Sequence, residues 1–218
     1  MATVYSELDE RLIEFIIKQP MFFVATAPCL NESGDGGHVN VSPKGYRDTF
    51  AVIDPVTVAY LDLTGSGAET IAHLRQNGRI TIMFCSFDRQ PKILRIYGTG
   101  RVILPSDSSW AELAGYFPGA ATAHPSSNGR ADGGGGEDGP PTEALALEHG
   151  IDRGNRRAII VVTADRISDS CGYAVPLMEL TEERDLLTRW AERRSAEDLV
   201  EYRVKHNTYS IDGHPALS

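Results

Sequence analysis

Residues 49–62 read TFAVIDPVTVAYLD and contain two short apolar runs, Thr49–Ile53 and Thr57–Asp62. Only Asp54, Pro55 and Val56 separate the two runs. Parallel strands need a crossover connection of about a dozen residues or more, so two strands joined this tightly form a hairpin. This stretch therefore predicts a mainly antiparallel sheet.

Further strands are predicted on both sides of this hairpin. Apolar, aromatic or β-branched residues dominate Met21–Ala27, Arg79–Phe87, Lys92–Leu104 and Arg157–Ala164. A further extended segment is predicted at His38–Lys44, after the turn-rich residues Asn31–Gly37. Helices are expected before Pro20, at about Ala68–Asn77 with Gly78 as the stop, at Ser108–Tyr116, and from Thr181 to about His206 with a break near Ser195. Short strands with helices at the margins predict a mainly β protein with helical additions, built as a small antiparallel barrel.

Three pairs of residues have the spacing of a helix-capping box. They are Ser6 with Asp9, Ser66 with Glu69, and Ser195 with Asp198. In such a box the hydroxyl accepts from a backbone amide three residues on, and the acidic side chain reaches back. We expect each pair to mark the start of a helix.

The chain is predicted to form one domain over residues 1–218. Residues 118–141 have almost no bulky apolar side chains and include four consecutive glycines, so they are expected to form a disordered loop. Residues 181–207 are expected to form a C-terminal helical extension.

Composition excludes several classes of protein. With 21 Lys and Arg against 30 Asp and Glu, the net charge of −9 argues against a nucleic-acid binder. No apolar run approaches the roughly 20 residues that cross a bilayer, and no basic region followed by an apolar one opens the chain, so no membrane association and a cytoplasmic location are expected. The 3 Cys and 6 His lack disulfide or metal-ligand spacing, and no metal site is predicted.

The segment His38–Gly45 is the first candidate for a binding site. If it is extended, Asn40, Ser42 and Lys44 share one face, and Val39 and Val41 share the other. An amide, a hydroxyl and an ammonium in line suit a polar, anionic ligand. The alternative is the solvated side of an ordinary antiparallel strand.

Two other segments carry candidate residues. Leu63–Thr70 joins a strand to a helix through glycines and hydroxyls, and backbone amides at a helix N-terminus bind phosphate. Helix capping by Ser66 and Glu69 is the alternative, and a dinucleotide fingerprint is disfavoured because the preceding strands form a hairpin. Arg95 shares a face with Tyr97, where it either pairs with a phosphate or flavin, or lies on the surface.

The order and spacing of several motifs resemble the FMN-binding split-barrel family related to pyridoxamine 5′-phosphate oxidase, specifically its branch of uncharacterised oxidase-like proteins. The motifs are Asn40–Gly45, the Thr64-Gly65-Ser66 turn, Gln76–Arg79, Arg95–Gly98, Ser170–Pro176 and Ser210–Gly213. The resemblance implies a six-stranded antiparallel split barrel, a homodimer, and FMN in a cleft between subunits.

The resemblance also implies which residues contact FMN. The flavin strand corresponds to Val39, Asn40, Val41, Ser42 and Lys44. The phosphate turn contributes Leu63, Thr64, Ser66 and Thr70, and Arg95 completes the set. Glu69 and Thr70 replace the family's basic pair at the helix start, and the basic cluster that binds pyridoxal phosphate is not visible at Ser210–Gly213.

These features predict an FMN-dependent oxidoreductase that transfers hydride through bound flavin and acts on a small-molecule substrate. The flavin carries the chemistry in such enzymes, so no catalytic side chain is assigned. Two alternatives remain: a flavin-binding module without turnover, and a split barrel that uses deazaflavin or haem. The second alternative follows from the replacement of the basic pair by Glu69 and Thr70.

Overall fold

The computed structural model describes residues 3–30, 36–117 and 155–218. The strands are β1 (Thr3–Tyr5), β2 (Phe22–Thr26), β3 (Asn40–Lys44), β4 (Phe50–Asp54), β5 (Thr57–Leu63), β6 (Arg79–Cys85), β7 (Lys92–Ile103) and β8 (Arg156–Cys171). The helices are α1 (Glu10–Lys18), α2 (Glu69–Asn77), α3 (Trp110–Ala114), α4 (Leu186–Glu192) and α5 (Ala196–His206), with a 3-10 turn at Arg47–Thr49.

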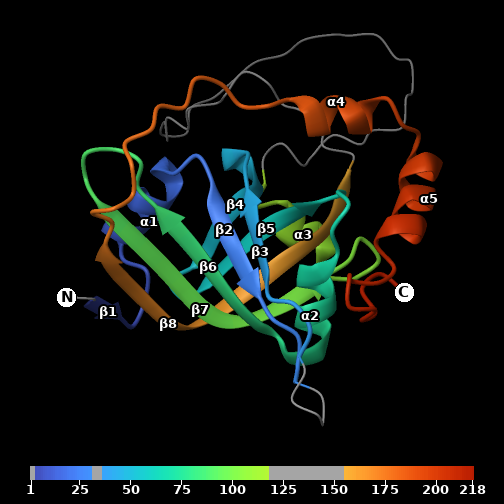
Figure 1. Ribbon diagram of the computed structural model, residues 1–218, viewed down its shortest axis with the longest axis horizontal. Helices are drawn as coiled ribbons and strands as arrows, with labels where there is room; N and C mark the ends of the chain where they lie inside the picture. Colours follow the sequence, from blue (N-terminus) through green and yellow to red (C-terminus); the bar gives the residue numbers. More distant parts are fainter. Residues whose placement is uncertain (1–2, 31–35, 118–154) are drawn as a thin grey trace, which may run out of the picture.

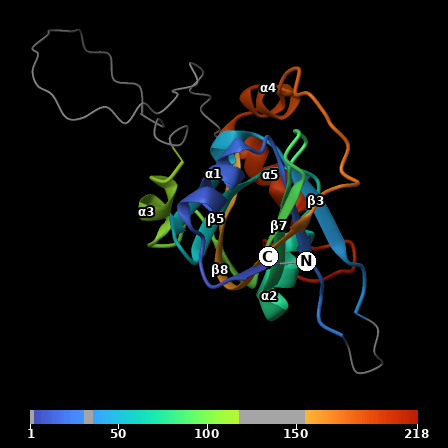
Figure 2. The ribbon, with the colours of Figure 1, turned by 90° about the vertical axis from the view of Figure 1, so that its left-hand side faces the viewer.

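The strands form one curved antiparallel sheet (Figures 1 and 2). Its order is β3-β2-β6-β7-β8-β5-β4, and β1 pairs with β8 outside this path. The predicted hairpin is confirmed, because β4 and β5 pair antiparallel through the Asp54–Thr57 turn. The long strands β7 and β8 pair over most of their length.

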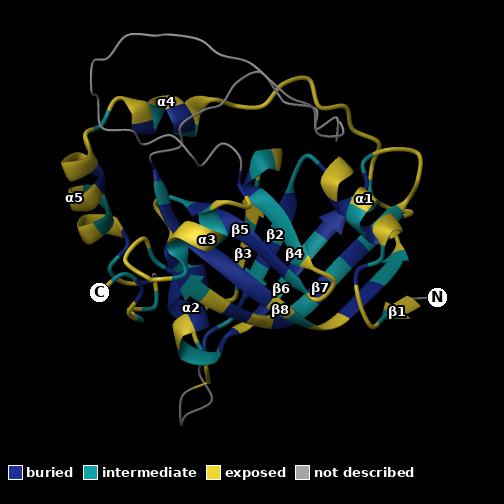
Figure 3. Ribbon diagram, turned by 180° about the vertical axis from the view of Figure 1, so that it is seen from behind, coloured by how far each residue is buried: buried dark blue, intermediate teal, exposed yellow. Residues whose placement is uncertain are grey.

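The two ends of the sheet meet through side chains. Phe50 on β4 packs against Phe22 on β2 with ring centroids 5.0 Å apart, and against Phe84 on β6 at 5.0 Å. Buried apolar residues from every side of the sheet fill the space within it, where the strands of Figure 3 are dark blue. No backbone ladder joins β3 to β4 in the sheet order, so the barrel is split along this seam.

The predicted fold class is confirmed, but the number of strands implied by the family resemblance is wrong. The sheet has eight strands among the described residues, rather than six. The three residues of β1 pair only with β8, and three residues are too short to show an alternating pattern. The strand expected at Arg157–Ala164 continues to Cys171, because its polar second half still pairs with β7 and β1.

The helices cover the sheet and one end of the barrel. Helix α2 packs against β2, β6 and β7, and α3, shorter than predicted, contacts β8. Residues 172–185 pass over the end of the barrel and lead to α4, and α5 then descends at the right-hand side of Figure 1. Both α4 and α5 lie within the predicted helical stretch, and the Ser195–Asp198 capping box at α5 is confirmed.

Two other predictions about caps and loops have different outcomes. The first helix begins after Asp9, whose own carboxylate accepts from the Leu12 amide, so Ser6 is not its cap as predicted. The predicted disordered loop at 118–141 lies outside the described residues. None of the described helices is long and apolar enough to cross a bilayer.

Candidate functional site

A cavity of about 410 Å³ opens between the end of β3 and the end of β5. Its walls come from the end of β3, the end of β5, the turn from β5 into α2, and one residue each of β8 and α4. The lining side chains and turn residues are Ser42, Pro43, Lys44, Gly45, Tyr46, Thr49, Leu61, Asp62, Leu63, Gly65, Ser66, Gly67, Glu69, Thr70, Arg157 and Leu187.

The polar face of β3 points toward this seam. Asn40 Nδ2 donates to Thr26 Oγ1 at 3.2 Å and to Thr70 Oγ1 at 3.0 Å. Ser42 Oγ donates to Asn40 Oδ1 at 2.9 Å. The shared face predicted from alternation is confirmed, and its interpretation as the solvated side of the strand is wrong. Val41 and Pro43, on the opposite face, are the exposed residues of this strand, and Val41 is 63% exposed.

A buried carboxylate joins β3, β5 and β8. Asp62, at the end of β5, is 1% exposed and receives Lys44 Nζ at 3.2 Å and Arg157 Nη2 at 2.7 Å. Burial alone would raise the pKa of Asp62, but the charges of Arg157 and Lys44 outweigh burial and hold that pKa below its ordinary value. The carboxylate is therefore ionised and fixes both cations at the wall of the cavity.

The start of α2 forms the opposite wall. Its N-cap is Ala68, which makes no side-chain capping bond, so the predicted capping box of Ser66 and Glu69 is wrong. Glu69 instead accepts from the Ile211 amide at 3.3 Å. The first amides of a helix have no partner within the helix, and among the described residues the N-cap Ala68 provides no side-chain acceptor for them. Backbone amides at the start of a helix favour an anion.

The turn before α2 is held in place from β8 and α5. Arg157 Nη1 donates to the Gly67 carbonyl at 2.7 Å, and Asn207 Nδ2 donates to the Gly65 carbonyl at 2.9 Å. Arg203 Nε donates to Thr64 Oγ1 at 2.8 Å. Burial and the nearby charge of Arg157 lower the pKa of Arg203. The turn is thus bordered by two guanidinium groups that the sequence analysis did not select.

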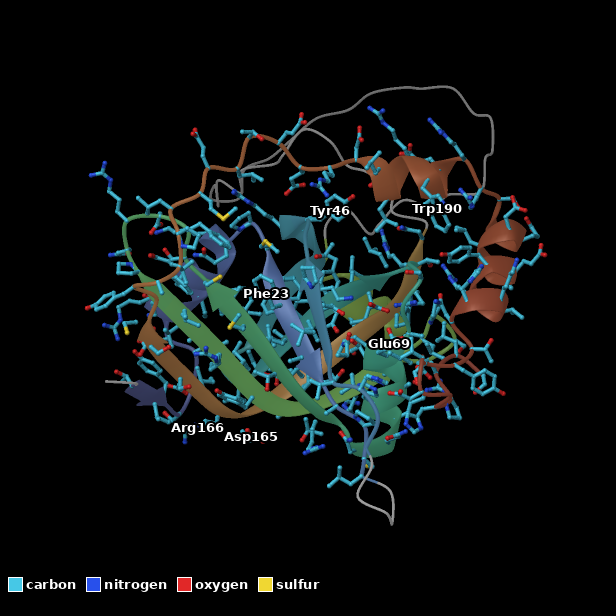
Figure 4. All side chains as sticks on the ribbon, viewed as in Figure 1. Phe23, Tyr46, Glu69, Asp165, Arg166 and Trp190 are labelled. Atoms are coloured by element: carbon cyan, nitrogen blue, oxygen red, sulfur yellow. The ribbon has the colours of Figure 1, made fainter. Side chains whose placement is uncertain are left out.

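Residues 172–185, here called the strap, run past one side of the cavity to α4 (Figure 1). Tyr46, with φ of 65°, is the positive-φ residue other than glycine among those described. Its hydroxyl donates to the Arg184 carbonyl at 2.7 Å, and Leu187 of α4 reaches the cavity wall. Figure 4 shows Tyr46 and Trp190 beneath this strap, with Glu69 lower on α2. The contact ties the end of β3 to the C-terminal helices.

The structure places the predicted site residues in three groups. Those that line the cavity are Ser42, Lys44, Leu63, Ser66 and Thr70. Asn40 lies beside them through its bond to Thr70, and Thr64 lies behind the turn. Those that lie away from the cavity are Val39 and Val41, on the outer face of the sheet, and Arg95, which donates to Ser170 Oγ at 3.1 Å.

Three residues of the site were missed from the sequence. The sequence could have pointed to Asp62, because a carboxylate at an inward position of a largely apolar strand is unusual. Arg157 and Arg203 had none, since their contact with the turn depends on residues about 90 and 139 positions away in the chain. The predicted absence of a metal site remains a prediction, and no metal-ligating cluster is present in the parts of the chain that the structure describes.

Comparison with known proteins identifies the family of this site and fold. The family model for pyridoxamine 5′-phosphate oxidase matches residues 8–132, which is more than half of the chain. The chain belongs to the pyridoxamine 5′-phosphate oxidase family. A curated member, the family protein ustO of Aspergillus flavus, is 36% identical over 231 aligned positions that cover all of this chain and 78% of the relative.

Solved structures also resemble this member of the family. HupZ of Group A Streptococcus is 18% identical with a TM-score of 0.46, over 73% of this chain and 91% of HupZ. HutZ, a heme storage protein of Vibrio cholerae, is 13% identical with a TM-score of 0.44, over 76% and 97%. An FMN-binding protein of Syntrophomonas wolfei is 11% identical with a TM-score of 0.42, over 72% and 81%.

Proposed function

We propose that the protein is a flavin-dependent oxidoreductase that holds the FMN unit of its cofactor in the cavity between β3 and α2 and works as a homodimer. The substrate is a small molecule oxidised or reduced at the flavin. A cytoplasmic location and the roles of Val39, Val41 and Arg95 stay predictions from the sequence.

One observation carries this proposal: an uncapped helix N-terminus and two cations face the same cavity. The amides of Glu69 and Thr70 lie at the start of α2, where the helix dipole favours an anion. Lys44 and Arg157 stand on the wall beside them. A phosphate monoester carries about −1.5 to −2 charges at pH 7 and accepts bonds on three oxygens, so it suits this arrangement.

The residues present fit a flavin mononucleotide. Cavities that bind ligands of this size span about 300–1,000 Å³, and this one measures about 410 Å³. The amides at the α2 start, with the hydroxyls of Ser66 and Thr70, would hold the phosphate. The polar face of β3, with Ser42 and Lys44, would hydrogen-bond the part of the cofactor next to the phosphate.

Bound flavin supplies hydride transfer, and the chain supplies position and electrostatics. The Asp62 carboxylate keeps Lys44 and Arg157 in fixed positions, so that the cavity wall needs little reorganisation when an anion binds. Leu187 and Tyr46 line one side of the cavity. Glu69 is the unfavourable charge, and its bond to the Ile211 amide keeps one carboxylate oxygen engaged.

The lining of the cavity does not favour haem. Protein ligands to haem iron are His, Cys, Met or Tyr. Among the described residues that line the cavity there is no His, Cys or Met. Tyr46, the one tyrosine of that set, already donates its hydroxyl to Arg184. Flavin, or a deazaflavin with the same phosphate end, fits this donor set better.

The test is titration of the purified apo-protein with FMN, followed by anaerobic reduction with NADH or NADPH and exposure to oxygen. We expect a bound-flavin spectrum, bleaching on reduction, and recovery on oxidation over many cycles. Binding without reduction by any donor would leave a flavin-binding module and overturn the enzymatic part. Binding of haem or deazaflavin in preference to FMN would overturn the cofactor assignment.

A further inference from the structure

A second cavity of about 350 Å³ lies against the first. The two share Gly65, Ser66 and Leu187 as lining residues. The turn from β5 into α2 is therefore bordered by one cavity on its β3 side and another on the side of α4 and α5. A ligand whose phosphate lies on this turn can extend into both.

Aromatic rings form the outer wall of the second cavity. Trp190 of α4 and Tyr202 of α5 both line it, and their ring centroids are 4.8 Å apart at an angle of 73°. The guanidinium of Arg194 lies over the Trp190 ring, 4.1 Å from its centroid, and covers one face of that ring. Half-buried, mutually packed rings of this kind bind flat heterocycles by stacking.

Positive charge continues along the turn between the two cavities. Arg203 bonds to Thr64, which lines the second cavity, and Arg157 bonds to the Gly67 carbonyl near the first. Together with Lys44 these cations outnumber the carboxylates Asp62 and Glu69 that face the same region. A pyrophosphate, with a phosphate on each side of the turn, would use both guanidinium groups.

We propose that the second cavity binds the adenosine half of a flavin dinucleotide, so that the preferred cofactor is FAD. Its pyrophosphate would follow the turn from Thr64 to Gly67, and its adenine would lie against Trp190 and Tyr202. This inference rests on the proposed function, because it places the FMN unit of the same cofactor in the first cavity.

The test compares the dissociation constants of FMN and FAD for the same apo-protein by titration calorimetry. We expect FAD to bind about tenfold more tightly than FMN, as stacking of one base on an aromatic side chain allows. Trp190→Ala should abolish most of this difference and leave the FMN constant within about twofold, while Trp190→Phe should keep it. The ratio of the two constants is the readout, since it is insensitive to a general loss of stability.

Trp110→Ala is the matched control, because the chain has 2 Trp and Trp110 lies on α3, outside both cavities. It should leave the FAD-to-FMN ratio unchanged. Tight FMN binding with no gain for FAD would overturn this inference and leave the proposed function standing. A Trp190→Ala variant that keeps both flavin dissociation constants but needs more NADH to reduce its bound FMN would also overturn this inference. The second cavity would then bind the adenine of the nicotinamide donor. Binding of neither flavin would overturn both.

Discussion

Asp62 shows how single residues join the two sides of the split barrel. The carboxylate is buried on β5, and its partners come from β3 and β8. A buried charge is costly unless it is paired, and here two cations pair with one carboxylate. The pairing leaves Lys44 and Arg157 on the cavity wall beside the start of α2, where the chain has Glu69 and Thr70. Arg157 thus provides from β8 a charge that the turn itself lacks.

Lys44→Ala should weaken FMN binding more than Lys92→Ala. Loss of one charge-assisted hydrogen bond costs about 1.5–3 kcal/mol, or one to two decades in the dissociation constant. Lys92 is a close match, because its Nζ lies 3.3 Å from Asp169 and its side chain is 29% exposed. Lys44 lies 3.2 Å from Asp62 and is 23% exposed.

Both variants remove one positive charge from a similar ion pair, so the overall field of the protein changes alike. Of the two lysines, only Lys44 lines the cavity between β3 and α2. Flavin titration of the two apo-variants in one buffer makes the measurement. Equal affinities would contradict the assignment of the Asn40–Lys44 face to the cofactor.

At the scale of whole elements, the sequence predicted the features whose interacting residues lie close together in the chain. The hairpin of β4 and β5 follows from a connection too short for any crossover. The box at Ser195 forms because its partners are three residues apart. The pair Ser66 and Glu69 has the same spacing, yet Ala68 begins α2 and Glu69 turns to the Ile211 amide. A partner 142 residues away outcompetes the local one, and no spacing rule shows that.

The same reason limited the prediction of the site. The alternation of β3 correctly placed Asn40, Ser42 and Lys44 on one face, because period two is a local property. Which face points inward depends on the neighbouring strands and on α2. Arg157 and Arg203 reach the turn only in the folded chain.

Gly98→Ala should disrupt the pairing of β7 with β8. The ladder shifts register between Tyr97 and Gly98, and a Cβ on Gly98 would lie 2.1 Å from the Thr163 carbonyl oxygen. Backbone on the facing strand cannot give way as a flexible side chain does. We expect a loss of about 1–3 kcal/mol or more in the free energy of unfolding, measured by urea denaturation.

Gly45→Ala is the control for this change. A Cβ on Gly45 meets no atom within 4 Å, so the same substitution should change stability by only about 0.5 kcal/mol. Equal destabilisation by the two variants would show that the close approach at the bulge is not what requires glycine at position 98.

At the scale of the whole molecule, the outer face of β3 is apolar and exposed. Val41 on β3, at the end of the sheet, is 63% exposed, and Val39 just before β3 is 70% exposed. The register places Ala25 beside Val41 and Phe23 beside Pro43, and these outward residues extend the apolar face onto β2. An edge strand with an exposed apolar face invites pairing with another protein surface. A second copy of the chain fits, since a twofold axis joins one such face to itself.

Val41→Glu should therefore convert a homodimer into a monomer. Two carboxylates would face each other across the twofold interface, where apolar contact is lost and like charges are brought together. Light scattering at micromolar concentration should give twice 23.8 kDa for the unmodified chain and 23.8 kDa for the variant. Val204→Glu is the control, because Val204 is 67% exposed on α5, away from this face, and should leave the mass unchanged. A monomeric unmodified chain that still binds flavin would show that one subunit completes the cofactor site, and the exposed valines would then need another partner.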